Sequence, residues 1–382
     1  MKKSVLCSCL AAALSTVPVY AQQITNVKGP GGYSITALDR QVSKPTVGGY
    51  FDTEFFINED GSNTFKAHRL IMETSARLHD KILISTEIEY EYGAQINNLT
   101  DTGELKIEQA WVDFEMDPAL VFRTGINVIP FGRVNTLHDS DVRDTTNKPI
   151  YNKYIVPGTW MDTSIGFHGV IDANEDMVVN YDAYIVNGLQ HDGETLKVDG
   201  SNGIRKARPG FKKDNNRDKA FVGRVGVSPF MGLEVGGSYY TGDVDASGAK
   251  RLNIVGADAF LQQGPFEVLA EYAQISLDEI EGVPTAMNGY FAELRYHIMP
   301  DFLKNLLFSA GFERPVFTLF ARYGAVDLDT SVEDKNDKTQ TTIGVNYRPM
   351  ETTVFKLEYE MNGEKKDETK NNAIIGSVAV GF

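Results

Sequence analysis

The stretch NAIIGSVAVGF, residues 372–382, alternates strictly between two kinds of side chain. Ile374, Val378, Val380 and Phe382 fall on one face of an extended chain, and the opposite face carries mostly small residues. The segment is therefore predicted to be a β-strand with one apolar face that ends in an aromatic residue.

The same two-residue period recurs along the chain. In residues 82–93, for example, Ile88 and Tyr90 share one face, while Glu87 and Glu89 share the other. Most of these segments have about the ten residues that a tilted strand needs to cross a membrane. We predict sixteen strands, at 46–57, 66–78, 82–93, 104–116, 120–129, 163–172, 177–188, 218–228, 233–243, 250–263, 266–276, 288–298, 316–326, 338–348, 352–361 and 372–382.

The connections between these segments differ by parity. Those after even-numbered segments are mostly tight, as at 79–81 and 117–119, whereas those after odd-numbered segments are longer and polar, as at 189–217. Short turns at one end and long loops at the other are typical of transmembrane β-barrels. One even connection, 299–315, is long, and its apolar residues at helical spacing predict a short helix on the barrel rim: Phe302, Leu303, Leu306 and Leu307.

The N-terminal 21 residues have the pattern of a secretory signal peptide. Lys2 and Lys3 precede a mostly apolar stretch, and Val19-Tyr20-Ala21 predicts cleavage before Gln22. Both cysteines lie in this segment, so thiol chemistry is not expected in the mature chain. We predict that residues 22–45 form an N-terminal periplasmic or lumen segment and that residues 46–382 form the barrel domain.

The charge of the chain argues against nucleic acid as a partner. Removing residues 1–21 takes away two lysines and no acid, which leaves 35 basic and 52 acidic side chains, or a net charge of −17. Nucleic-acid phosphates require a basic footprint. After residue 21, no apolar run approaches the length of a membrane-spanning helix, so the chain is either soluble or a barrel.

Several local motifs point to a known family. They are IEQAWVDF at 107–114, FRTG at 122–125, IPFG at 129–132, PGTW at 157–160 and GFHGV at 166–170. This run resembles the phosphate-selective porin O/P family, and the resemblance implies a trimeric, sixteen-stranded, water-filled channel in the bacterial outer membrane. The last strand is similar to the terminal strands of outer-membrane barrels, which implies that Val378, Val380 and Phe382 are recognised by the barrel-assembly machinery.

The long connection 133–162 is the candidate for narrowing the channel. Sixteen strands leave an aqueous lumen, and loops of this length are usually functional or disordered. The resemblance implies that this third external loop folds into the barrel. Cationic side chains in a pore favour anions, and the candidates for the constriction and its selectivity are Arg123, Arg133, Arg143, Lys148, Lys153, Arg69, Arg224 and Arg322. Acidic residues are expected on the same inward faces, so pairing between acids and bases remains an alternative.

The fourth external loop, residues 189–217, reverses the acidic character of the chain. It carries seven basic and four acidic residues, with the basic side chains of interest at Arg205, Lys206, Arg208, Lys212 and Lys213. Such a loop focuses anions toward a pore mouth, or it binds the phosphates of neighbouring lipopolysaccharide. The sequence leaves both readings open.

An enzyme is not predicted. The sequence His138-Asp139-Ser140 contains triad residue types, but consecutive residues rarely give the geometry that catalysis needs. The segment 243–248 opens like a calcium loop, but its twelfth position is Ile254 rather than Glu. We therefore predict no catalytic residue, metal site or cofactor.

The sequence thus predicts a passive porin for small hydrophilic solutes, with small anions such as phosphate or carboxylates as cargo. The expected partners are two further copies of the chain in a homotrimer, lipopolysaccharide and other outer-membrane lipids, and the barrel-assembly machinery. The alternatives are a weakly selective general porin and a non-conducting outer-membrane barrel that acts as an adhesin or a hydrolase.

Overall fold

The structure is a computed structural model that describes residues 27–28, 34–35, 45–93, 103–191, 197–211, 213–304, 311–312, 314–365 and 371–382. The predicted signal peptide lies outside the described residues. Of the predicted N-terminal segment, the described part is mainly two short strands, β1 (Val27–Lys28) and β2 (Ser34–Ile35), which pair antiparallel. The proposed domain boundaries therefore stay predictions.

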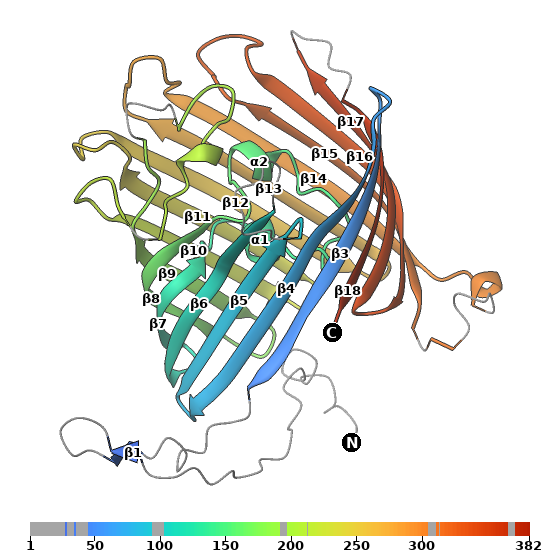
Figure 1. Cartoon of the computed structure of the whole chain (residues 1–382), viewed down its shortest axis with the longest axis horizontal. Helices are drawn as coiled ribbons and strands as arrows, with labels where there is room; N and C mark the ends of the chain where they lie inside the picture. Colours follow the sequence, from blue (N-terminus) through green and yellow to red (C-terminus); the bar gives the residue numbers. More distant parts are fainter. Residues whose placement is uncertain are drawn as a thin grey trace.

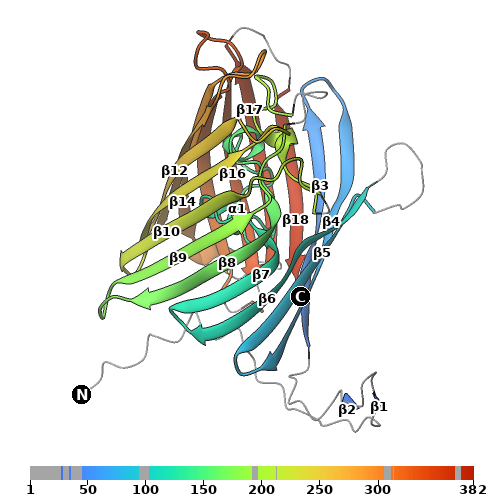
Figure 2. The ribbon, with the colours of Figure 1, turned by 90° about the vertical axis from the view of Figure 1, so that its left-hand side faces the viewer.

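The rest of the chain forms a closed, all-β antiparallel barrel of sixteen tilted strands (Figure 1, Figure 2). Every predicted segment is a strand, with ends within three residues of those expected. The strands are β3 (Thr46–Asn58), β4 (Asn63–His79), β5 (Ile82–Glu91), β6 (Glu104–Asp117), β7 (Leu120–Val128), β8 (Met161–Asp172), β9 (Val178–Val186), β10 (Ala220–Phe230), β11 (Leu233–Asp243), β12 (Arg251–Gln263), β13 (Phe266–Leu277), β14 (Ala286–Ile298), β15 (Val316–Asp327), β16 (Asp337–Met350), β17 (Thr353–Glu364) and β18 (Ala373–Gly381).

The last strand closes the ring. β18 pairs with β17 on one side and with β3 on the other, where Gly381 lies opposite Tyr50. Beyond the strand end, Phe382 N donates to Gly49 O at 2.9 Å and Gly49 N donates to Phe382 O at 3.2 Å. The terminal strand thus closes the barrel, and closure removes the unpaired edges that an open sheet would expose.

The two faces of the sheet differ as the alternation predicts. On β18, Ile374 is 44% exposed, whereas its neighbour Ile375 is fully buried. Large apolar side chains cover the outer surface, including Phe51, Val225, Leu294, Leu319 and Leu357. The buried inward positions are largely polar or charged, as at Glu54, Asp258, Glu293, Arg322 and Lys356. A barrel with an apolar exterior and a charged interior is suited to a membrane and a wet lumen.

Helical structure is sparse. Of the helix predicted in 299–315, the structure shows one 3₁₀ turn, η2 (Asp301–Leu303), while Leu306 and Leu307 lie outside the described residues. A second 3₁₀ turn, η1, covers Arg205–Ala207, and two four-residue helices, α1 (Arg133–Thr136) and α2 (Tyr151–Tyr154), precede β8. Within the parts of the chain described, none of the helices has the length and apolar character to cross a membrane.

Gly125 on β7 permits a close approach of two strands. Its φ is +134°, and a Cβ at this position would overlap the carbonyl oxygen of Ala110 on β6. We expect Gly125→Ala to lower the free energy of unfolding by about 1–3 kcal/mol through backbone strain. The measurement is the temperature at which the folded barrel converts to the slower-migrating unfolded form on gels.

The matched control is Gly237→Ala on β11, where the nearest atom, Gly256 O, lies 4.0 Å from an added Cβ. We expect this variant to unfold close to the wild-type temperature. Equal unfolding temperatures for the two variants would contradict the role assigned to Gly125.

Candidate functional site

The segment between β7 and β8, residues 129–160, lies inside the barrel, and we call it the constriction segment. Figure 1 shows its two short helices, α1 and α2, enclosed by the strands. Its hydrogen-bond partners include residues of β13, β15 and β17, which lie across the lumen from its own ends. The segment therefore divides the interior of the barrel.

Glu271 on β13 holds the start of the constriction segment. Its Oε1 accepts hydrogen bonds from Arg133 N at 2.7 Å and Val134 N at 2.6 Å. Gly132 has φ +68°, and a Cβ there would overlap the Glu271 carboxylate. The glycine of the IPFG motif thus allows the backbone to approach the wall closely, and the carboxylate satisfies two backbone donors.

The middle of the segment is held from the opposite wall. Arg322 on β15 donates to Thr145 Oγ1 at 2.6 Å and to Asn147 O at 3.0 Å. On β17, Glu358 Oε2 accepts from Thr146 N at 3.0 Å, and Lys356 Nζ donates to Ser140 O at 2.7 Å. These contacts fix the segment across the lumen rather than leaving it at the mouth.

One side of the lumen is filled by an apolar core. Trp160 contacts Tyr240 of β11 with ring centroids 5.2 Å apart, and Tyr151 contacts Phe291 of β14 at 5.8 Å. The fourth external loop adds to this core with Val198, Leu189, Ile204 and Ala207. The polar cavities therefore lie elsewhere along the constriction segment.

The first of these cavities, the basic cavity, has a volume of about 290 Å³. It lies between the constriction segment, η1 and the walls of β4, β16 and β17. One carboxylate, Glu360, and His68 border it, together with six basic side chains: Arg69, Arg143, Lys148, Lys153, Arg205 and Arg208. The cavity is therefore rich in positive charge within an acidic protein.

Three of these six cations, Arg143, Lys148 and Arg208, have neutral partners, whereas Arg69 pairs with Glu89 and Glu91. The Arg143 guanidinium donates to the carbonyl oxygens of His138 at 2.8 Å and Thr146 at 2.8 Å. Lys148 Nζ donates to Thr159 Oγ1 at 2.9 Å, and Arg208 donates to Thr159 O at 2.9 Å. Among the described residues, no carboxylate forms an ion pair with any of these three. Burial lowers the pKa of Lys148 well below its usual range, and the charges of Arg69 and Arg143 lower it further.

A second cavity of about 340 Å³, the mixed cavity, lies beside the segment and next to β12–β16. Its charges are more closely matched than those of the basic cavity: five arginines, Arg133, Arg143, Arg295, Arg322 and Arg348, lie with three carboxylates, Asp144, Glu267 and Glu293, and His297 is beside them. Arg295 and Arg348 both pair with Asp144, at 3.4 and 3.3 Å. Burial opposes ionisation of Asp144, but Arg295 and Arg348 outweigh it and lower its pKa. This cavity would not favour one sign of charge strongly.

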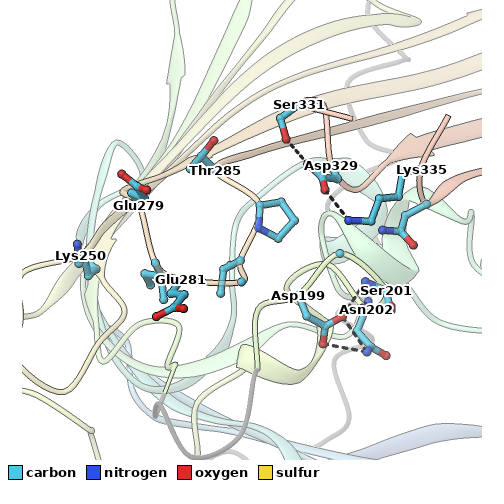
Figure 3. A pocket seen from close by; sticks show the side chains of 16 residues that line it. Asp199, Ser201, Asn202, Lys250, Glu279, Glu281, Thr285, Asp329, Ser331 and Lys335 are labelled. Atoms are coloured by element: carbon cyan, nitrogen blue, oxygen red, sulfur yellow. Dashed lines mark hydrogen bonds and ion pairs between the residues drawn. The ribbon is translucent and has the colours of Figure 1, made fainter. Parts of the chain in front are cut away.

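A third cavity, of about 1130 Å³, opens among the external connections (Figure 3). It lies between the loop residues 199–202, the connection after β13 and the connection after β15. Its charged side chains are mainly acidic, and Lys335 Nζ pairs with Asp329 at 3.4 Å. A solute that approaches from outside meets this acidic rim before the basic cavity.

The structure thus brings six of the predicted candidates together and separates the others. Arg133 and Arg322 border the mixed cavity. Arg123 pairs with Asp113 at 2.6 Å, and Arg224 pairs with Asp258 and Glu234 on the wall. In the fourth loop, Lys206 and Lys213 are exposed away from these cavities, and Lys212 lies outside the described residues.

Two residues that line the cavities, Arg348 and His68, are not among the candidates predicted from the sequence. Arg348 lies on the same inward face of β16 as Thr342 and Asn346, so the two-residue period would have predicted that it faces the lumen. His68 precedes the candidate Arg69 and would lie on the opposite face of a regular strand. The structure places His68 and Arg69 together at the basic cavity, and nothing in the local sequence pattern predicts this position for His68.

A closed barrel of this size with a charged, divided lumen defines a channel of the bacterial outer membrane. The sequence matches the family described as Gram-negative porin over residues 8–367, and the chain belongs to this family. It therefore forms an outer-membrane channel for small solutes. The match does not single out the phosphate-selective O/P group.

Individual proteins similar to this chain agree with that placement. An uncharacterized protein of Aquifex aeolicus is 25% identical over 377 residues, which cover 91% of this chain and 82% of the relative. The anion-selective porin from Comamonas acidovorans is 12% identical, with a TM-score of 0.57, and the match covers 90% of this chain and all of that one. OmpT of Vibrio cholerae, in a trimer form, is 13% identical, with a TM-score of 0.55, over 89% of this chain and 99% of that one.

The Glu271 anchor leads to a testable prediction. Glu271→Ala leaves the Arg133 and Val134 N–H groups without their acceptor, at a cost of about 1–3 kcal/mol for each buried donor. We expect noisier single-channel currents in planar bilayers because the constriction segment is less firmly held. Glu271→Gln, which keeps one carbonyl acceptor, is the control and should be closer to wild type. Wild-type current traces from Glu271→Ala would show that this anchor is not needed.

Proposed function

We propose that this porin prefers small anions, with phosphate and small carboxylates as the solute class. The observation that carries the proposal is the basic cavity, where six cationic side chains and one carboxylate surround about 290 Å³. Both the constriction segment and the fourth loop contribute to it. An anion that crosses the narrowed lumen would meet this charge at close range.

The positive charge of the basic cavity is poorly compensated by its surroundings. Arg143 and Arg208 donate to carbonyl oxygens, which orient a guanidinium without cancelling its charge. Walls of low dielectric around a narrow passage strengthen the field of such charges. Arginine also offers forked donors that match the oxygens of phosphate and carboxylate. The basic cavity thus contains two kinds of cation: arginines, which stay charged, and Lys148, whose charge depends on the pH.

The comparisons give this proposal limited support. The structurally similar porin from Comamonas acidovorans is described as anion-selective. The local motifs in 107–170 resemble the phosphate-selective O/P family, which is consistent with the same solute class. The sequence identity to the Comamonas acidovorans porin is low, so the main support for the proposal is the basic cavity of this chain.

A weakly selective general porin is the second candidate, and the mixed cavity favours it. There Arg295 pairs with Asp144 and Arg322 pairs with Glu293, so carboxylates compensate a larger share of the positive charge than in the basic cavity. If the narrowest part of the solute path runs through this cavity, selectivity would be low. Reversal potentials separate the two candidates directly.

We do not propose catalysis or adhesion. The His138 ring contacts Glu108 at 3.1 Å and Asn135 O at 3.1 Å, and the Ser140 hydroxyl accepts from Arg143 instead. The three consecutive residues therefore do not form a nucleophile and base pair.

The proposed assembly is a homotrimer inserted by the barrel-assembly machinery through Val378, Val380 and Phe382. A structurally similar outer-membrane protein, OmpT of Vibrio cholerae, is described in a trimer form. Lys206 and Lys213 are exposed and remain available for lipopolysaccharide phosphates, whereas Arg205 and Arg208 border the basic cavity. The fourth loop thus divides its cations between the two roles left open by the sequence.

Neutralising the basic cavity should reduce anion preference. At a pH low enough for Lys148 to be charged, we expect the double variant Lys148→Met, Arg208→Gln to lower the chloride-to-potassium permeability ratio by at least about twofold, because two charges without a carboxylate partner are removed. The measurement is the reversal potential in a KCl gradient. The control is Arg77→Gln, since Arg77 lies near the turn end of β4, pairs with Glu115 at 2.6 Å and does not line the cavity. A double variant with the wild-type ratio would favour the general porin.

The lowered pKa of Lys148 gives the selectivity a pH dependence. A lysine with a lowered pKa is charged at low pH and loses its charge below the usual titration range of about 10.4. Wild-type anion preference should therefore fall as the pH rises through that lowered pKa. The contribution of Lys148 is the difference between the reversal potentials of wild type and Lys148→Met at each pH.

This difference should be largest at low pH and should shrink as the pH rises. Carboxylates that titrate at low pH contribute to both proteins and cancel in the comparison. A constant difference up to pH 10 would show that Lys148 keeps its charge and that its pKa is not lowered.

A further inference from the structure

Three buried ligand-type side chains meet on the inward face of β3 and β4. Asp52, Glu54 and His68 are 3%, 4% and 8% exposed. His68 Nδ1 lies 2.9 Å from Asp52 Oδ2 and 2.9 Å from Glu54 Oε1. One ligand atom from each residue lies within 4.8 Å of the other two.

A β-bulge creates this arrangement. Asp52 pairs with Arg69 and Thr53 pairs with Ala67, so His68 is the extra residue of β4 with no partner on β3. Bulges re-aim a side chain that a regular strand would send to the other face. Asp52 and Glu54 are two residues apart and share the inward face, and the bulge turns His68 toward both.

The hydrogen bonds available to this group do not satisfy it. A ring nitrogen carries at most one hydrogen, so Nδ1 cannot donate a full hydrogen bond to both carboxylates. In the described part of the chain, buried Asp52 Oδ1 has no hydrogen-bond partner of normal geometry, although the Ser140 side chain approaches Asp52 from the constriction segment. Two adjacent buried carboxylates therefore share one histidine nitrogen, with only the Ser140 side chain besides it at Asp52, and this arrangement is costly unless a cation joins them.

We propose that Asp52, Glu54 and His68 bind a divalent transition-metal ion of the zinc class. One imidazole nitrogen and two carboxylate oxygens form a ligand set that zinc accepts, with a fourth position for water. Tetrahedral zinc with bonds of 2.0–2.1 Å places its ligand atoms about 3.3 Å apart. The 2.9 Å separations thus need to widen by only a few tenths of an ångström.

An ion can reach this site from the lumen, and carboxylates at the site compensate its charge. His68 borders the basic cavity, so an ion in the lumen can reach the site. The nearby cation Arg69 is itself paired, with Glu89 at 2.8 Å and with Glu91 at 3.9 Å. The two carboxylates balance the two charges of the metal. Binding at this site does not depend on the proposed anion preference.

The test is titration of the purified, folded porin with Zn²⁺ by calorimetry after removal of metal with a chelator. We expect one Zn²⁺ ion per chain and a much weaker response to Mg²⁺, which prefers oxygen ligands and keeps its own waters. Titration with Co²⁺ gives a second readout, because its visible absorption reports direct coordination by nitrogen and oxygen. Absence of Zn²⁺ binding to the wild-type protein would overturn the proposal.

Variants locate the site. His68→Ala and Asp52→Asn should each weaken Zn²⁺ binding by at least about tenfold. The matched control is His168→Ala, because His168 lies on β8, belongs to neither ligand cluster and is 3.4 Å from Asp113, so its removal should leave binding unchanged. The unfolding temperature on gels confirms that each variant is folded, and Asp52→Asn serves if His68→Ala does not fold.

A second group, Glu87, His138 and Asp139, also brings ligand atoms within 4.8 Å of one another. His138→Ala therefore distinguishes the two clusters. Zn²⁺ binding that is lost in His138→Ala but retained in His68→Ala and Asp52→Asn would move the metal to that cluster and overturn the assignment made here.

Discussion

Closure of the backbone hydrogen-bond ladder is the constraint on which the rest of this structure depends. Lipid offers no partners to N–H and C=O groups, so a sheet that crosses a membrane must have no free edge. The pairing of β18 with β3 meets this requirement. Once the ring is closed, the two-residue period assigns alternate side chains to lipid and to the interior. The outer face becomes apolar, and the charged residues on the inward face lie in a lumen where they need water or a partner.

Charged side chains inside the barrel have different kinds of partner on the wall and in the loops. On the wall, arginines find carboxylates on neighbouring strands, as Arg123 does with Asp113 and Arg224 with Asp258. The constriction segment and the fourth loop bring in cations whose partners are mainly carbonyl and hydroxyl oxygens, and these carry the proposed selectivity. The net charge of the chain, −15, is therefore a poor guide to the charge that a solute meets, since position inside the barrel decides which side chains count.

The sequence predicted the barrel well because strand alternation and turn length are local properties. Pairing across the lumen depends on register and on the path of long loops, and local patterns do not contain it. Arg208 reaches Thr159 because the fourth loop folds onto the constriction segment, a contact between residues 49 positions apart. His68 shows the same limit on a smaller scale, since only the bulge on β4 places it beside Asp52. Arg123 and Arg224 were reasonable candidates by residue type, but the register gives each a carboxylate partner.

The central claim is that the basic cavity attracts anions into the narrowed lumen. Anomalous diffraction from crystals of the porin soaked in bromide tests it most directly, because bromide is a small anion that can be located by its own signal. The account predicts an anomalous peak in the basic cavity, within contact distance of Arg143 or Lys148. Bromide sites confined to the outer surface or the mixed cavity, with the basic cavity empty, would contradict it.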